Sequence, residues 1–238
     1  MGLKMTAVKK QKWRNNWRSI ASRPVQMTRH LIVCEGTETE PRYFEEMKAV
    51  LSTVNERKVS VVVRGSGKHT LDLFDYAEDL CRYAPESFDH VWLVFDKDDF
   101  PPADFDLVER RCCDASDSSK SFHALWSNPC FEIWLLLHLR YTTAPMDAAA
   151  CQKALNDALK REYGVDYRKN MDGLFGLVDY KRDAALSNAA KQEKYHVSIG
   201  NEKPSMMNPG TRMADLFAEI GPYLTERFKS RDGRGDKR

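Results

Sequence analysis

Acidic side chains follow two short apolar runs of this 238-residue chain, at the points where strands are predicted to end. Glu35 follows the first run, and Asp96, Asp98 and Asp99 follow a later one. Carboxylates that converge in one crevice repel one another, so their joint ionisation requires a cation. Mg²⁺ is hard and prefers oxygen ligands, and it is usually held by a few carboxylates, waters and substrate phosphates. We therefore expect these residues to hold Mg²⁺, with Mn²⁺ as a substitute; a solvated loop or a helix cap is the alternative for any one of them.

The spacing of Asp96 and Asp98 predicts the direction of their side chains. Residues two apart in extended backbone point to the same side, so both carboxylates are expected in one crevice. Lys97 lies between them and is expected to point away, as a solvated or structural residue.

A cationic, glycine-containing turn, Arg64-Gly65-Ser66-Gly67-Lys68, follows another apolar run. Its backbone N–H groups, with Lys68 and Arg64, are candidates for binding a substrate phosphate. The turn lacks the GxxxxGK[ST] pattern of a Walker loop, so an ordinary flexible turn is the alternative.

Other candidates depend on residue type alone. Glu132 is either a carboxylate that faces the metal or an acid placed favourably in the first turn of a helix. Lys169 and Lys181 are candidates for a phosphate contact. His138, in an apolar stretch, is expected to be a core histidine, and Cys34, inside an apolar strand, is not expected to act as a nucleophile.

The first half of the chain alternates short apolar runs with amphipathic stretches, which is typical of a layered α/β domain. Each strand-helix unit spans about thirty residues, which favours right-handed crossovers and a parallel sheet with helices on both faces. The predicted strands are 30–34, 58–63, 89–95 and 121–126, and the predicted helices between them are 37–54, 70–83 and 105–113.

The second half of the chain is predicted to be helical. Asn128-Pro129 is expected to begin a helix that is apolar on every side and therefore buried. Further helices are predicted at 147–163, 172–195 and 211–228, the last of them begun by the segment 208–211.

The charge of the chain is divided unevenly. Residues 1–30 carry a net charge of +8 and residues 227–238 one of +4, whereas residues 31–226 carry −10. The basic N-terminal segment also contains Trp13 and Trp17, and cations with interleaved aromatic rings suit phosphate contact and base stacking. A solvated terminus is the alternative.

These patterns divide the chain into four segments. They are a basic N-terminal arm (1–29), an α/β core (30–127), a helical extension packed on the core (128–228) and a basic tail (229–238).

The composition excludes several classes of protein. No apolar run approaches the roughly 18 residues of a membrane-spanning helix, and the N-terminal segment lacks the apolar core of a signal peptide. The six cysteines contain no CxxC pair, so neither a disulfide framework nor a zinc site is indicated. We expect a cytoplasmic protein without a membrane partner.

Three blocks carry a resemblance to a known family: CEGTETEPRYF (34–44), VFDKDDF (94–100) and SNPCFEIWLLLH (127–138), followed later by NPGT (208–211). The acidic ends of the first and third strands resemble the two signatures of the TOPRIM fold, which occurs in topoisomerases, primases and OLD-type nucleases. The blocks together, over roughly residues 30–212, resemble the RloB family, small TOPRIM-like proteins associated with restriction-modification and abortive-infection loci.

The resemblance implies a TOPRIM-like, Rossmann-like fold and a nuclease activity. Glu35 resembles the general acid or base of TOPRIM proteins, and Asp96 and Asp98 resemble their metal-binding pair. A Mg²⁺-dependent nuclease that cleaves RNA, such as tRNA, or DNA in antiphage defence is thus expected, with an ABC- or SMC-like ATPase as a partner. The alternative is a nucleic-acid-binding or regulatory subunit that cleaves nothing by itself. Phosphoryl transfer to an aspartate fits less well, because the acidic cluster follows the third strand.

Overall fold

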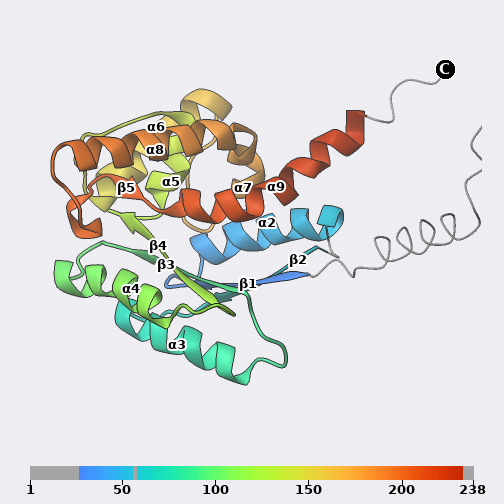
Figure 1. Ribbon diagram of the computed structural model, residues 1–238. Helices are drawn as coiled ribbons and strands as arrows, with labels where there is room; N and C mark the ends of the chain where they lie inside the picture. The colour runs from blue at the N-terminus through green and yellow to red at the C-terminus, as the bar shows by residue number, and fades with distance from the viewer. Residues whose placement is uncertain (1–26, 56–57, 233–238) are drawn as a thin grey trace, which may run out of the picture.

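The computed structural model describes residues 27–55 and 58–232, and a five-stranded sheet lies at its centre (Figure 1). The strand order is β2-β1-β3-β4-β5; neighbours among the first four strands are parallel, and β5 is antiparallel to β4. This arrangement confirms the predicted α/β class and the parallel pairing. The strands are β1 (Thr28–Cys34), β2 (Val59–Gly65), β3 (His90–Asp96), β4 (Ser121–Asn128) and β5 (Gly210–Thr211).

Helices cover both faces of the sheet. Figure 1 shows α3 and α4 below the sheet, and α2 with the helices of the second half above it. The helices are α2 (Thr39–Asn55), α3 (Thr70–Tyr83), α4 (Pro102–Ala115), α5 (Glu132–Leu139), α6 (Ala148–Tyr163), α7 (Leu174–Val178), α8 (Arg182–Ser198) and α9 (Met213–Asp232), with 3-10 turns η1 (Asp179–Lys181) and η2 (Pro204–Met206).

Strands β1 and β3 contain continuous apolar runs, Leu31 to Cys34 and Val91 to Phe95, because both faces of the sheet are buried there. In β1, Ile32 and Cys34 belong to the hydrophobic core beneath α2 and α5, whereas Leu31 and Val33 belong to the core beneath α3 and α4. The first of these cores also takes residues from α5, α7, α8 and α9, so the second half of the chain shares a core with the sheet.

Helix α5 is buried on every side, as its sequence predicts. Trp134 at its centre is fully buried, stacks on Phe217 at 5.1 Å between ring centroids, and donates from Nε1 to the hydroxyl of Tyr43 over 3.0 Å. This hydrogen bond joins α5 to α2, the helix that follows Glu35 in the chain.

Removal of the Tyr43 hydroxyl is expected to destabilise the protein. Tyr43→Phe would leave the buried Trp134 Nε1 without its acceptor, at a cost of about 1–3 kcal/mol in the free energy of unfolding, measured by denaturant titration. The matched control is Tyr83→Phe, whose side chain is 79% exposed, and which we expect to change stability by less than about 0.5 kcal/mol. Equal effects of the two substitutions would contradict a structural role for this bond.

The predicted start of the buried helix at Asn128-Pro129 is wrong. Asn128 is the last residue of β4, where it pairs with Gly210 of β5, and its peptide bond to Pro129 is cis. The Asn128 side chain donates to the carbonyl oxygens of Pro204 and Ser205 instead of capping a helix. Helix α5 therefore begins later, at Glu132.

Two further helix boundaries differ from the prediction. Thr211 lies in β5 opposite Ser127 rather than in a helix, and its hydroxyl accepts from the backbone N–H of Met213, where α9 begins. The predicted helix 172–195 is divided into α7, η1 and α8. Gly173 has a φ of 81°, which ends any helical path from residue 172, so α7 begins after it.

Two sequence predictions concern membrane spans and the chain termini. No helix of the described residues is long and apolar enough to cross a membrane. The predicted basic arm (1–29) and tail (229–238) fall largely on residues 1–26 and 233–238, which lie outside the described part of the chain.

Candidate functional site

The ends of β1 and β3 bring Glu35 and Asp96 together, as the sequence predicts. Cys34 pairs with Val94 in the parallel register, and the backbone N–H of Glu35 donates to the carbonyl of Val94 over 2.9 Å. The Glu35 carboxylate accepts in turn from the backbone N–H of Asp96, with 3.3 Å between Oε2 and N. The two acids thus lie at one edge of the sheet, where the carboxyl ends of parallel strands meet.

A cavity of about 620 Å³ opens at this edge. Asp98, Asp99 and Lys169 line it together with Glu35 and Asp96. His69 and Phe100, whose rings meet edge to face at 5.9 Å between centroids, also belong to the lining. The cavity therefore gathers the four acids of the predicted metal set with Lys169.

The geometric reason given for Asp98 is wrong, although its position in the cavity agrees with the prediction. Strand β3 ends at Asp96, and Asp98 has a φ of 31°, so the backbone between them is not extended. The Asp98 N–H donates to the carbonyl of Pro129 over 3.0 Å, which turns the chain across the end of β4. Lys97 has the expected structural role, since its Nζ donates to the carbonyl of Phe100.

A further buried carboxylate, Glu40, was missed by sequence reasoning. It lies in the first turn of α2, where an acid is also explained by the helix dipole, so its type and place gave no distinct signal. The only indication of a functional role was that Glu40 lies within the block 34–44, which carries part of the family resemblance. The carboxyl group lies so close to Gly36 that a Cβ built there would be 2.5 Å from Oε2. The absence of a side chain at Gly36 thus leaves the space that Glu40 occupies.

Glu132 joins the same group of acids. Its side chain is only 3% exposed, and the Tyr167 hydroxyl donates to its Oε1 over 2.8 Å. Both sequence interpretations of Glu132 agree with the structure, because the residue lies in the first turn of α5 and its charge also raises the pKa of Asp96 and of Glu40. Nothing in the sequence indicated Tyr167.

The surroundings of Asp96 disfavour its ionised form. Burial raises the pKa of Asp96 well above its ordinary value, and the charges of Glu40, Glu132 and Asp98 raise it further. A hydrogen bond from the backbone of Phe131 opposes this shift. The Asp96 Oδ1 atom is buried without a hydrogen-bond partner among the residues that the structure describes.

The neighbouring acids show the same trend. Burial raises the pKa of Glu40, and Glu132 and Asp98 raise it further, whereas Lys169 lowers it. Burial also raises the pKa of Asp98, which Lys169 again lowers. Carboxylates thus surround Asp96, and Lys169 is the cation that lowers the pKa of two of them.

A comparison with protein-family models matches residues 30–220 to the family described as RloB-like protein. The chain belongs to the RloB family. The resemblance seen in its sequence blocks is therefore confirmed over most of the chain. No curated protein and no solved structure matches it.

The donor types at the RloB site suit Mg²⁺, since carboxylate oxygens are its preferred protein ligands. The unpartnered Oδ1 of Asp96 and the mutual repulsion of the acids are what a bound cation would relieve. Within 27–55 and 58–232, however, no three His, Cys, Asp or Glu side chains are grouped closely enough to hold a metal ion by themselves. The predicted set of Glu35, Asp96, Asp98 and Asp99 is therefore not a ready-made ligand cage. It fits a Mg²⁺ that takes one or two carboxylates and completes its shell with waters and phosphate oxygens.

Three predicted cations lie away from the cavity lining. Arg64 lines a different cavity, against α3. Lys68 lies 5.5 Å above the ring of Tyr76, and Lys181 pairs with Glu162. Of the cations proposed for phosphate contact, only Lys169 lines the cavity with the acids.

Cys34 and His138, which the sequence does not favour as catalytic residues, are both buried. Cys34 is fully buried, and burial raises the pKa of its thiol, which disfavours a nucleophilic thiolate. His138 is a core histidine whose Nδ1 lies 3.0 Å from the carbonyl oxygen of Trp134, and burial lowers its pKa to about 4.

Proposed function

We propose that this RloB chain cleaves phosphodiester bonds of RNA, such as tRNA, or of DNA, and that Mg²⁺ or Mn²⁺ bound at the acidic cavity supports the reaction. The observation that carries the proposal is the buried Asp96 Oδ1, which has no described partner while three further carboxylates raise the pKa of the residue. A fold gains nothing in stability from such an arrangement, because a buried polar atom without a hydrogen-bond partner is costly. Binding of a cation and a phosphate accounts for its presence.

The residues that line the acidic cavity would have distinct roles in the reaction. Asp96 and Asp98 would hold the metal, and Asp99, which lines the same cavity, would supply a further carboxylate beside it. When bound, Mg²⁺ neutralises non-bridging phosphate oxygens and stabilises the leaving oxyanion. Glu35 moves the proton of the attacking or leaving group, since its carboxylate lies beside Asp96 in the same cavity. Lys169 attracts the phosphate.

The family supports a biological setting for this activity. We place the protein in antiphage abortive-infection defence, in the cytoplasm and beside an ABC- or SMC-like ATPase that senses infection. This setting rests on the RloB resemblance, and the cleavage chemistry rests on the cavity.

A second candidate function is a non-cleaving subunit that binds nucleic acid or regulates a partner. The observation that favours it is the absence, among the described residues, of a group of three side chains able to hold a metal unaided. A regulatory subunit needs no such group.

A nuclease assay separates the two functions. Purified full-length protein is incubated with labelled tRNA, single-stranded RNA and plasmid DNA, in Mg²⁺, Mn²⁺ or EDTA, with and without the partner ATPase. We expect metal-dependent cleavage that is lost in Glu35→Gln and retained in Glu45→Gln, an exposed acid outside the cavity. Cleavage in EDTA, or equal cleavage by both variants, would overturn the site assignment. Metal-dependent binding without cleavage would establish the second function.

Lys169→Ala is expected to shift the pH profile of cleavage. Lys169 lowers the pKa of Asp98 and of Glu40, so its removal raises both, and a higher pH is then needed to ionise them. The acid limb of the rate profile should therefore move upward by a fraction of a pH unit, while the rate at alkaline pH changes less. The profile is measured under single-turnover conditions, with Lys153→Ala as the control on an exposed helix surface. A uniform loss of rate at every pH would instead indicate a role in substrate binding alone.

A further inference from the structure

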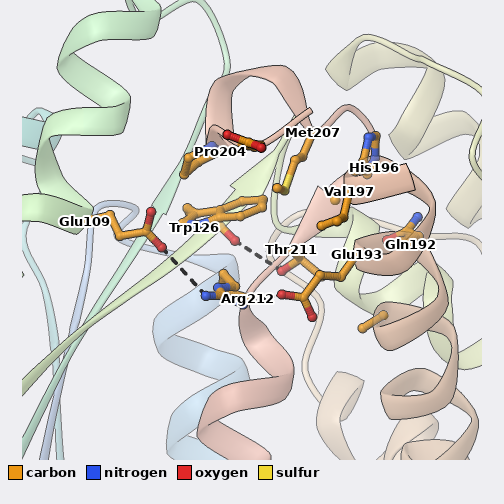
Figure 2. A pocket seen from close by; sticks show the side chains of 13 residues that line it. Glu109, Trp126, Gln192, Glu193, His196, Val197, Pro204, Met207, Thr211 and Arg212 are labelled. Atoms are coloured by element: carbon orange, nitrogen blue, oxygen red, sulfur yellow. Dashed lines mark hydrogen bonds and ion pairs between the residues drawn. The ribbon is translucent and has the colours of Figure 1, made fainter. Parts of the chain in front are cut away.

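A second cavity shares no lining residue with the acidic cavity and lies beside β4 and β5, where β5 is the outermost strand of the sheet. It has a volume of about 220 Å³ and is formed by residues of α4, β4, α8, η2 and β5 with the segments beside them (Figure 2). A Cβ at Gly210 would lie 2.7 Å from the carbonyl oxygen of Met207, so this part of the wall is closely packed. The proposed nuclease chemistry makes no use of this cavity.

The charged residues of its lining are mostly acidic. Glu109, Glu193 and Glu202 contribute three carboxylates, and Arg212 contributes the one guanidinium of the lining. Arg212 lies between two of these acids, with 2.8 Å from Nη1 to Glu193 and 3.9 Å from Nη2 to Glu109 (Figure 2). The lining therefore keeps a net negative charge, which favours a cationic group and disfavours phosphate.

Two buried polar atoms in the lining lack partners among the described residues. Trp126 is 3% exposed and its Nε1 donor is unpaired; Gln192 is 1% exposed and its Oε1 acceptor is unpaired. The Gln192 amide is held in place, because its Nε2 donates to the carbonyl of Thr142 over 2.7 Å. Unpaired buried groups of this kind cost about 1–3 kcal/mol each. A peptide supplies both a donor and a carbonyl acceptor, whereas a free amine supplies donors alone.

The rim of the cavity is apolar on the side of α8. Val197, which lines the cavity, is 59% exposed; Ile199, two residues after it, and Met206, which precedes the lining residue Met207, are also exposed large apolar residues. Figure 2 shows Val197 and Met207 on the same side of Trp126. Such a rim suits the aliphatic stem of a long basic side chain, and apolar neighbours of that side chain.

We propose that this cavity receives an arginine side chain from a basic segment of a partner protein. The guanidinium pairs with the carboxylates of Glu193 and Glu202 and presents its remaining donors toward Gln192 Oε1, while a carbonyl oxygen of the same peptide accepts from Trp126 Nε1. The stem packs on Val197. Arginine is the favoured cation because its five donors match several acceptors at once. Arginine is also enriched among the few residues that carry most of the binding energy of a protein–protein interface. The proposal stands whether or not the acidic cavity cleaves nucleic acid.

Calorimetric titration of the full-length protein with blocked peptides tests it. The probe is acetyl-leucyl-arginyl-leucinamide, and its matched control carries citrulline, which has the shape of arginine without the charge. Spermidine and adenosine are titrated separately. We expect the arginine peptide to bind about tenfold more tightly than the citrulline peptide and than spermidine, and Glu202→Gln and Glu193→Gln each to weaken it several-fold. Glu45→Gln, on the exposed surface of α2, should leave the affinity unchanged.

Four outcomes would overturn the proposal. They are equal affinity for the arginine and citrulline peptides, tighter binding of spermidine than of the peptide, binding of adenosine in place of arginine, and no binding at concentrations up to about 5 mM. Both glutamate variants alter exposed side chains, so their folding is readily verified by thermal denaturation.

Discussion

Asp96→Asn is expected to abolish metal-dependent cleavage and to make the protein more stable at neutral pH. The loss of the central carboxylate removes a metal ligand, and we expect a fall in rate of at least about 100-fold, since a bound metal contributes several kcal/mol to stabilisation of the transition state. The gain in stability has a separate cause: the substitution removes a carboxyl group whose ionisation is disfavoured in the folded state by burial and by the charges of Glu40, Glu132 and Asp98.

The pH dependence of the stability gives the sign of this effect. The pKa of Asp96 is higher in the folded than in the unfolded state, so its carboxyl group costs nothing while both states are protonated. As the pH rises, the unfolded state releases the proton first, and the folded state loses stability until the pH passes the folded pKa. The difference in Tm between Asp96→Asn and the wild type should therefore be larger at about pH 8 than at about pH 5.

Added Mg²⁺ should reverse the order of stability. A ligand that binds only the folded state at a concentration of about 100 Kd adds about 3 kcal/mol, and each kcal/mol raises Tm by about 2–4 °C in a chain of this size. We expect Mg²⁺ to raise the Tm of the wild type and to leave that of Asp96→Asn unchanged. Differential scanning fluorimetry over a range of pH and Mg²⁺ concentration measures both effects. The control is Asp114→Asn, which alters an exposed acid of α4 outside the cavity lining. A constant difference in Tm at every pH, or equal stabilisation of the two proteins by Mg²⁺, would contradict the assignment.

The arrangement of the sheet was predictable from the sequence because the central strands are buried on both faces. Such strands appear as continuous apolar runs, and each is followed by an amphipathic helix that identifies it. The errors fall where local signals have a second meaning. Asn128-Pro129 has the form of a helix start, yet Asn128 pairs with β5, and β5 itself is only two residues long, too short to show a strand pattern.

The part of the candidate site that lies at the strand ends was predictable from the sequence. Glu35 and Asp96 were found because they directly follow apolar strands, whose ends must meet in a parallel sheet. Glu132 was a candidate from its residue type alone. Glu40 and Tyr167 reach the same place from a helix and a distant loop, and their positions depend on tertiary packing that no local pattern encodes. An acid in the first turn of a helix has an ordinary explanation, so only its burial distinguishes Glu40 from an exposed helix acid.

Gly36→Ala is expected to impair cleavage by displacing Glu40, while the fold persists. A Cβ at residue 36 would lie 2.5 Å from Oε2 and 2.8 Å from Oε1 of Glu40, so the carboxyl group must move. The movement is inexpensive, because these atoms end a flexible side chain, and we expect little change in Tm. Displacement of a group in an active site by about 1 Å can cost about 100-fold in rate, and we expect a loss between about 10-fold and 100-fold.

Two further variants decide whether Glu40 carries this effect. Gly176→Ala, in α7, is the matched control, because a Cβ there would meet nothing within 4 Å, and it should leave cleavage unchanged. In a Glu40→Ala background the obstacle is gone, so Gly36→Ala should add nothing to the defect of Glu40→Ala alone, which is the non-additivity expected of residues in contact. If the two defects instead multiplied, Gly36 would act on cleavage by a route other than Glu40. The double-mutant cycle, measured as single-turnover rates, thus tests whether the acid hidden in the first turn of α2 belongs to the site that the strand ends form.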